Sequence, residues 1–164
     1  MDGLYKIKEI TFDFRNKYKY SEETEGLKRV LTFFLPYLED YLKERKILLE
    51  INEKIKMADY YVHFAITDPK EEDFITHFGS VSFDKDQKQV IILLRTIAGP
   101  SWGNKLELMK TMIHEIFHLF IEGEENVKNS TEDFMNSFDL ETRKFICREL
   151  LTIEEIEIIE EKLR

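Results

Sequence analysis

The sequence predicts an α/β domain built from a sheet, a long N-terminal helix and a second helix near the middle of the chain. Five short apolar segments typical of strands precede residue 98, and one long segment among them repeats its apolar residues at helical spacing. The chain has 164 residues, is 43% hydrophobic and contains no linker rich in Gly, Pro or Ser, so we expect one domain. Within it, residues 1–122 are expected to form an upper α/β subdomain and residues 123–164 a lower helical subdomain.

The N-terminal half is predicted to combine strands with one helix. Residues 4–14 partly alternate apolar and polar side chains, which predicts a first strand. Ser21 is suited to cap a helix that extends to about Arg45, because the apolar residues between them recur every three or four positions. Four further segments are predicted to be strands: 47–52, 59–67, 78–83 and 89–97. The polar residues 84–87 predict a hairpin turn between the last two.

A central helix is predicted to follow a loop, from Asn104 to about Glu122. Asn104 and Glu107, three residues apart, have the pattern of a helix start, and Gly123 is suited to end the helix. The stretch 123–138 is polar and is predicted to be irregular.

Two shorter helices are predicted to complete the chain. Asp139 is suited to cap the first of them. Thr152 and Glu155 have the spacing of a capping box, which predicts the start of the second.

Composition and charge exclude several classes of protein. The formal net charge is −9, whereas a phosphate-binding surface needs clustered Lys and Arg, so no nucleic-acid partner is expected. The apolar runs, such as residues 90–94, are far shorter than the roughly 20 residues of a membrane span, so no membrane partner is expected. The first residues lack the pattern of a signal peptide and Cys147 is the only cysteine, so we expect a cytoplasmic protein.

The central helix carries the pattern HExxH, as His114, Glu115 and His118. Residues four apart on a helix lie on the same face, so both imidazoles can reach one zinc ion at about 2.0–2.1 Å. Glu115 lies about 100° around the helix, where it can contact a water on that ion rather than the ion itself. The motif predicts a zinc site with His114 and His118 as ligands and Glu115 as general base.

A catalytic zinc site normally has three protein ligands and one open position, so a third donor is expected after the motif. Glu122 lies two turns along the same helix, about 12 Å from His114 along the axis, which is too far. Gly123 can reverse the chain, which would bring Glu124 or Glu125 to the metal. Two carboxylates further along the chain are the remaining candidates: Glu132 and Glu141.

Residues 89–150 resemble the metzincin clan of zinc peptidases, and most closely its archaemetzincin branch. The clan pattern is HExxHxxGxxH or HExxHxxGxxD, followed by a methionine turn beneath the metal. By this resemblance Glu124 occupies the third-ligand position and Met135 is placed like the methionine of the structural Met-turn. The sequence departs from the pattern at Ile121, where the clan has glycine, and Gly123 comes two residues later. The resemblance implies a mixed twisted sheet, one catalytic Zn²⁺ and a peptide or protein substrate.

A second resemblance competes with the first. The segment 132–138, EDFMNSF, is similar to the E-x-x-A-N-x-F segment on the ligand helix of gluzincin-like regulatory peptidases of the ImmA type. This resemblance implies that Glu132 is the third zinc ligand and that Met135 is a packing residue.

Both resemblances predict a zinc-dependent metallopeptidase. Glu115 would take a proton from the attacking water and pass it to the leaving amine. By analogy with related enzymes, an extended peptide is expected to dock along a sheet edge formed by the hairpin 78–97. The alternative from another class is a catalytically silent metal-binding or interaction protein with the same ligands, because a His₂Glu site is compatible with either role.

Overall fold

A computed structural model of the chain describes most of its helices in detail. The backbone is described for residues 11–15, 21–45, 61–67, 79–84, 89–95 and 102–162. Side chains are described for residues 25–45, 105–158 and 160–161.

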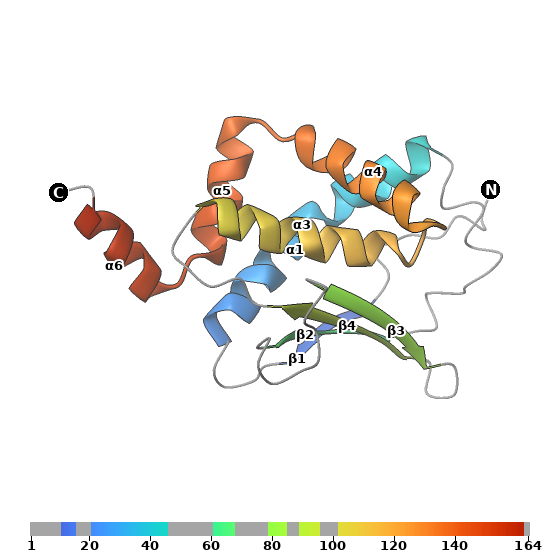
Figure 1. Cartoon of the computed structure of the whole chain (residues 1–164), viewed down its shortest axis with the longest axis horizontal. Coiled ribbons are helices and arrows are strands. Elements are labelled where there is room, and N and C mark those ends of the chain that lie inside the picture. Colours follow the sequence, from blue (N-terminus) through green and yellow to red (C-terminus); the bar gives the residue numbers. More distant parts are fainter. Residues whose placement is uncertain are drawn as a thin grey trace.

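Five helices make up most of the described part of the chain (Figure 1). Their bounds are α1 (Ser21–Glu44), α3 (Trp102–Phe117), α4 (Glu124–Asn136), α5 (Leu140–Leu150) and α6 (Ile153–Lys162). α3 lies across the middle of the molecule, α4 lies above it in the view of Figure 1, α5 descends past the N-terminal end of α3, and α6 lies near the C-terminus. Among the described residues, no helix is both long and apolar enough to cross a membrane.

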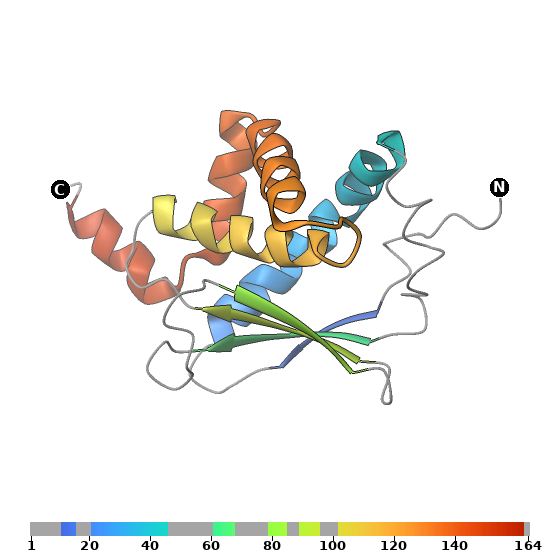
Figure 2. The same ribbon diagram turned by 45° about the vertical axis from the view of Figure 1, so that its right-hand side comes forward.

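Four described strands form one sheet beneath the helices (Figure 2). Their bounds are β1 (Thr11–Arg15), β2 (Tyr61–Thr67), β3 (Gly79–Asp84) and β4 (Gln89–Arg95). The order across the sheet is β1-β2-β4-β3; β1, β2 and β4 are parallel, and β3 pairs antiparallel with β4 at one edge, with Val81 opposite Ile92. α3 packs against β3 and β4, which places the HExxH segment over this end of the sheet.

The predicted fold class is wrong. An α/β sheet carries helices on both faces, whereas Figures 1 and 2 show every described helix on the same side of the four strands. Of the residues whose side chains are described, 84% are helical. The core that these residues form is made by helices packing on one another and by the turn after α3.

One hydrophobic core joins the helices. Its buried side chains come from α1, α3, α4 and α5 and from the turn after α3; the largest fully buried apolar ones are Phe34, Phe117, Phe120, Leu27, Leu31, Leu38 and Leu42. α1 and α5 approach each other closely at Gly26, where a Cβ atom would lie 2.3 Å from the carbonyl oxygen of Glu149. The core thus connects the two parts of the chain on either side of residue 122.

Several local predictions are confirmed. The helix predicted from Ser21 is α1. Asp139 caps α5 and accepts a hydrogen bond from the backbone N–H of Thr142 at 2.8 Å. The capping box at the start of α6 is formed: the backbone N–H of Thr152 donates to Glu155 Oε1 at 3.1 Å, and the N–H of Glu155 donates to Thr152 Oγ1 at 3.2 Å.

Two helix predictions are wrong. α3 ends at Phe117, five residues before the predicted end, because the chain tightens into a turn in which the N–H of Leu119 bonds the carbonyl of Ile116. Residues 124–136, predicted to be irregular, form α4. The helix is stabilised by a narrow stripe of buried side chains at Val127, Thr131 and Phe134, which pack on the rest of the core.

The described strands fall within four of the five predicted segments or overlap them closely. β1 covers only the end of the segment predicted over residues 4–14, and the first part of that segment lies outside the described residues. The strand predicted at 47–52 and the turn residues after Asp84 also lie outside them.

Candidate metal centre

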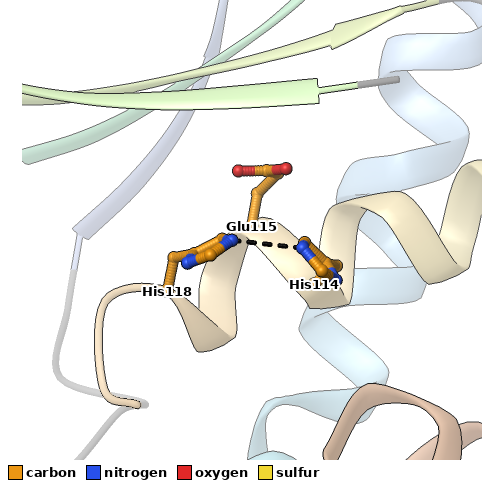
Figure 3. A group of neighbouring side chains, drawn as sticks. All are labelled: His114, Glu115 and His118. Carbon is orange, nitrogen blue, oxygen red and sulfur yellow. Dashed lines mark hydrogen bonds between the residues drawn. The ribbon is translucent and has the colours of Figure 1, made fainter. Parts of the chain in front are cut away.

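α3 is held firmly against the core, and this fixes the HExxH motif. Its buried face includes Met109, Ile113 and Ile116, all fully inaccessible to solvent. The helix bounds end at Phe117, but the N–H of His118 still bonds the carbonyl of His114 at 3.1 Å, so the helical spacing continues through the motif. The two imidazoles therefore project side by side, with ring centroids 4.8 Å apart (Figure 3).

The turn after α3 brings the chain back toward the histidines. Leu119 and Phe120 are buried at its base. Gly123 has φ = 90°, a conformation that side-chain-bearing residues rarely adopt, and its carbonyl accepts the N–H of Val127 at 3.0 Å as α4 begins. The predicted reversal at Gly123 is confirmed, and it places Glu124 at the first position of α4.

Glu124 contacts both histidines of the motif. Its Oε1 lies 2.9 Å from Nε2 of His114, and its Oε2 lies 2.9 Å from Nε2 of His118. The two Nε2 atoms lie 3.1 Å from each other. Each Nε2 carries at most one hydrogen, so at most two of these three contacts can be hydrogen bonds at one time. Three electron-pair donors that face one another in this way are the arrangement that a bound cation stabilises.

The spacing of these donor atoms is close to that around a zinc ion. Ligand atoms that surround Zn²⁺ tetrahedrally at 2.0–2.1 Å lie about 3.3–3.4 Å from one another. The two Nε2 atoms, 3.1 Å apart, and the 2.9 Å contact of each with a different oxygen of Glu124 are shorter than this by only a few tenths of an ångström. Glu124 has 71% of its side-chain surface exposed, so little hinders an outward shift of that size. Two imidazoles and one carboxylate are also a donor set that suits zinc.

Burial sets the charge of the first histidine. Desolvation lowers the pKa of His114, and the carboxylate of Glu124 opposes this effect only in part. The neutral ring keeps a lone pair for a metal, and its contact with Glu124 is a hydrogen bond rather than an ion pair at neutral pH. Lys110, one turn earlier on α3, also lowers the pKa of His114 through its positive charge.

Glu115 occupies a different environment from Glu124. Its side chain rises from between the two histidines toward the sheet (Figure 3), and Glu115 is only 5% exposed. Burial, followed by the negative charge of Glu124, raises the pKa of Glu115 to about 7. One ligand atom from each of His114, Glu115 and His118 lies within 4.8 Å of the others. A carboxyl group with a pKa near neutrality, close to the two imidazoles, is suited to accept and release a proton.

The other candidate ligands do not reach the histidines. Glu132 lies two turns further along α4 and faces Lys110, with 3.8 Å between the carboxylate and the ammonium. Glu125 is exposed in the first turn of α4, and Glu141, on α5, pairs with Lys144 at 3.6 Å. Spacing along the sequence contained no signal for the contact between Lys110 and Glu132, because the two residues belong to different helices.

The predicted methionine turn is wrong. Met135 lies within α4 and not in a turn, and its half-buried side chain packs against the hydrophobic core. The error arose because the segment that contains Met135 was expected to be irregular, whereas it forms α4. His63 is described only in its backbone, within β2, and His77 lies outside the described residues.

Comparison with known proteins returned no relative. The chain matches no protein-family model, no curated protein and no solved structure.

Proposed function

We propose that this protein is a zinc-dependent metallopeptidase whose zinc ligands are His114, His118 and Glu124. The observation that carries the proposal is the contact of both Glu124 oxygens with the two Nε2 atoms of the HExxH motif, at 2.9 Å each. Two histidines placed by chance on a helix surface would not be expected to contact a carboxylate that the chain brings back to them through a turn that requires glycine. The resemblance to metzincins points to the same three positions.

Glu115 would be the general base and acid of the reaction. A zinc ion held by the three ligands would lower the pKa of a bound water toward neutrality and polarise the scissile carbonyl. Glu115 would accept the proton of the attacking water and deliver it to the leaving amine. The burial that raises the pKa of Glu115 also keeps competing solvent away from its carboxylate.

The substrate of this site would be an extended peptide or a protein segment. β3 forms one edge of the described sheet and packs near α3. A peptide could pair with the edge of β3 that no described strand occupies, while its scissile bond reaches the metal. The proposed setting is the cytoplasm, where the buried thiol of Cys147 would stay reduced.

Metal analysis of the purified protein tests the ligand set. We expect about one zinc per chain in the wild type, and a loss of affinity above about 100-fold in His118→Ala and Glu124→Gln, because loss of an outer-shell partner already costs about 10–100-fold. Glu125→Gln is the matched control, since it removes an adjacent carboxylate of the same helical turn. Loss of zinc from Glu132→Gln with retention in Glu124→Gln would contradict this ligand set and favour the gluzincin arrangement.

Hydrolysis of a mixed peptide library, followed by mass spectrometry, tests the chemistry. Glu115→Gln should keep the zinc and lower cleavage by about 10²–10⁴-fold, the usual contribution of a general base. Wild-type protein that binds zinc but cleaves no peptide or unfolded protein would refute the peptidase proposal. That result would leave the metal-binding interaction protein as the better interpretation.

A further inference from the structure

A hollow lies away from the histidines, between α1, the C-terminal end of α4 and the start of α5. Its volume is about 540 Å³, within the range of about 300–1,000 Å³ typical of ligand pockets. None of its lining residues belongs to the histidine cluster. Figure 2 shows the C-terminal half of α1 diverging from α4 on this side of the molecule. We call this hollow the α1–α4 cavity.

One wall of the α1–α4 cavity is aromatic and open to solvent. Phe33 and Tyr37 are 48% and 55% exposed, although large apolar side chains of this kind are usually buried. Their positions are fixed by other rings: the centroid of Phe33 lies 4.9 Å from those of Phe34 and Phe145, and 5.8 Å from that of Tyr37. The wall is therefore a preorganised aromatic surface, which lowers the entropic cost of binding a partner.

The charge of the α1–α4 cavity is negative. Its lining includes four carboxylates, those of Asp40, Glu44, Asp133 and Asp139, against the single guanidinium of Arg45. Asp133 is engaged by Arg45 and Asp139 caps α5, whereas Asp40 and Glu44 form no ion pair or hydrogen bond within the described part of the chain. Two exposed carboxylates thus remain available beside the exposed rings.

The chain's own Arg45 demonstrates which chemical group this surface accepts. The central carbon of its guanidinium lies 3.6 Å from the centroid of the Tyr41 ring, and Nη2 donates to Asp133 at 2.6 Å. Tyr41 also donates its hydroxyl hydrogen to Asp133, at 2.8 Å. A planar cation that stacks on an aromatic face and pairs with a carboxylate is thus already present at one end of the cavity. Tyr37 and Asp40, one turn earlier on α1, offer another ring and another carboxylate. Lys43 pairs with Glu39 at 2.8 Å, and the charge of Asp40 also acts on its ammonium.

We propose that the α1–α4 cavity binds a peptide segment of a partner protein in which an arginine neighbours an aromatic residue. The guanidinium would stack on Tyr37 and pair with Asp40 and Glu44, and the aromatic side chain would pack against Phe33. The proposal does not depend on the zinc site, and it assigns the protein a second, cation-selective interaction surface.

Titration of the full chain with acetyl-Phe-Arg-amide, followed by NMR spectroscopy, tests this proposal. We expect saturable binding with a dissociation constant near 1 mM, as befits one stacked side chain and an exposed ion pair. Acetyl-Phe-citrulline-amide has the same shape without the charge and should bind about fivefold to tenfold more weakly. Equal affinity for the two peptides, or no saturation at 10 mM peptide (~10 times the expected constant), would overturn the proposal.

Variants locate the binding site. Tyr37→Leu keeps an apolar side chain without the π face and should weaken binding of the arginine peptide about threefold, as should Asp40→Asn. Glu25→Gln removes an exposed charge from the first part of α1 and should leave binding unchanged. If Glu25→Gln weakened binding as much as Asp40→Asn, the acidic surface would attract the peptide nonspecifically, which would contradict the proposal. His118→Ala should also bind normally, so failure of the zinc proposal leaves this one standing. Weaker binding in His118→Ala would place the peptide at the histidines and refute the proposal.

Discussion

The close approach of α1 to α5 predicts that Gly26→Ala destabilises the protein. The added Cβ would lie 2.3 Å from the carbonyl oxygen of Glu149, 3.3 Å from its carbonyl carbon and 3.4 Å from Cα of Leu150. All three atoms belong to the backbone of α5, so no side-chain rotation can make room for the added Cβ. The substitution must instead push the two helices apart.

The size of the effect follows from the distances. Real Cβ atoms essentially never lie within 3.0 Å of such an atom, so the helices must separate by at least about 0.7 Å. A gap of about 0.5–1 Å forfeits a quarter to a half of each dispersion contact across the interface, and overpacking typically costs about 1–3 kcal/mol. Alanine regains about 1 kcal/mol through its higher helix propensity. We therefore expect a net loss of up to about 2 kcal/mol and a melting temperature lower by up to roughly 8 °C.

Urea and thermal unfolding of Gly26→Ala beside Glu25→Ala measure this effect. Glu25 is the exposed neighbour on α1, and its replacement keeps a good helix former without entering the interface, so its melting temperature should stay within about 1–2 °C of the wild type. A rise in melting temperature for Gly26→Ala would refute the reasoning, because it would mean that helix propensity acts alone and that α1 and α5 do not touch at this point.

Three further predictions concern buried charge, a helix cap and the metal. Glu155→Gln should lower the free energy of unfolding by about 3–5 kcal/mol, because it leaves the ammonium of Lys105, 2% exposed and 2.8 Å from Glu155, without its counter-charge. Glu141→Gln, which breaks an exposed ion pair, is the control. Equal urea midpoints for the two variants would contradict the prediction. The hydrogen bond from Thr142 lowers the pKa of Asp139 below its usual 3.8, so the cap stabilises the fold above about pH 4 and loses this effect as the pH falls through the lowered pKa. The difference in melting temperature between the wild type and Asp139→Ala should therefore be smaller at pH 3 than at pH 7. A difference that stays constant with pH would exclude the charge of Asp139 as its source. Zinc added to metal-free protein at about 100 times its dissociation constant should raise the free energy of unfolding by about 2.7 kcal/mol and the melting temperature by roughly 5–11 °C. A chelator should reverse this effect, and Glu124→Gln should abolish it. An equal rise in that variant would place the metal elsewhere.

Sequence patterns located the features that depend on neighbours along the chain. The spacing of His114 and His118 places both rings on one face of any α-helix, and the caps at Asp139 and Thr152 require only residues within the same turn. Gly123 was identified for the same reason, since its backbone conformation is a local property.

Tertiary structure decided which carboxylate meets the histidines and how the core is built. The sequence allowed either Glu124 or Glu132 as the carboxylate that joins the two histidines. Only the antiparallel packing of α4 on α3 distinguished them, because it places Glu124 at the histidines and Glu132 beside Lys110. α4 itself was missed because Val127 is its only apolar residue before Phe134; its stability comes from burial of Val127 and Phe134 against helices that are distant in sequence. The fold class was wrong for a related reason: apolar periodicity predicts that a segment is a strand or a helix, but only packing determines whether helices cover one face of a sheet or both.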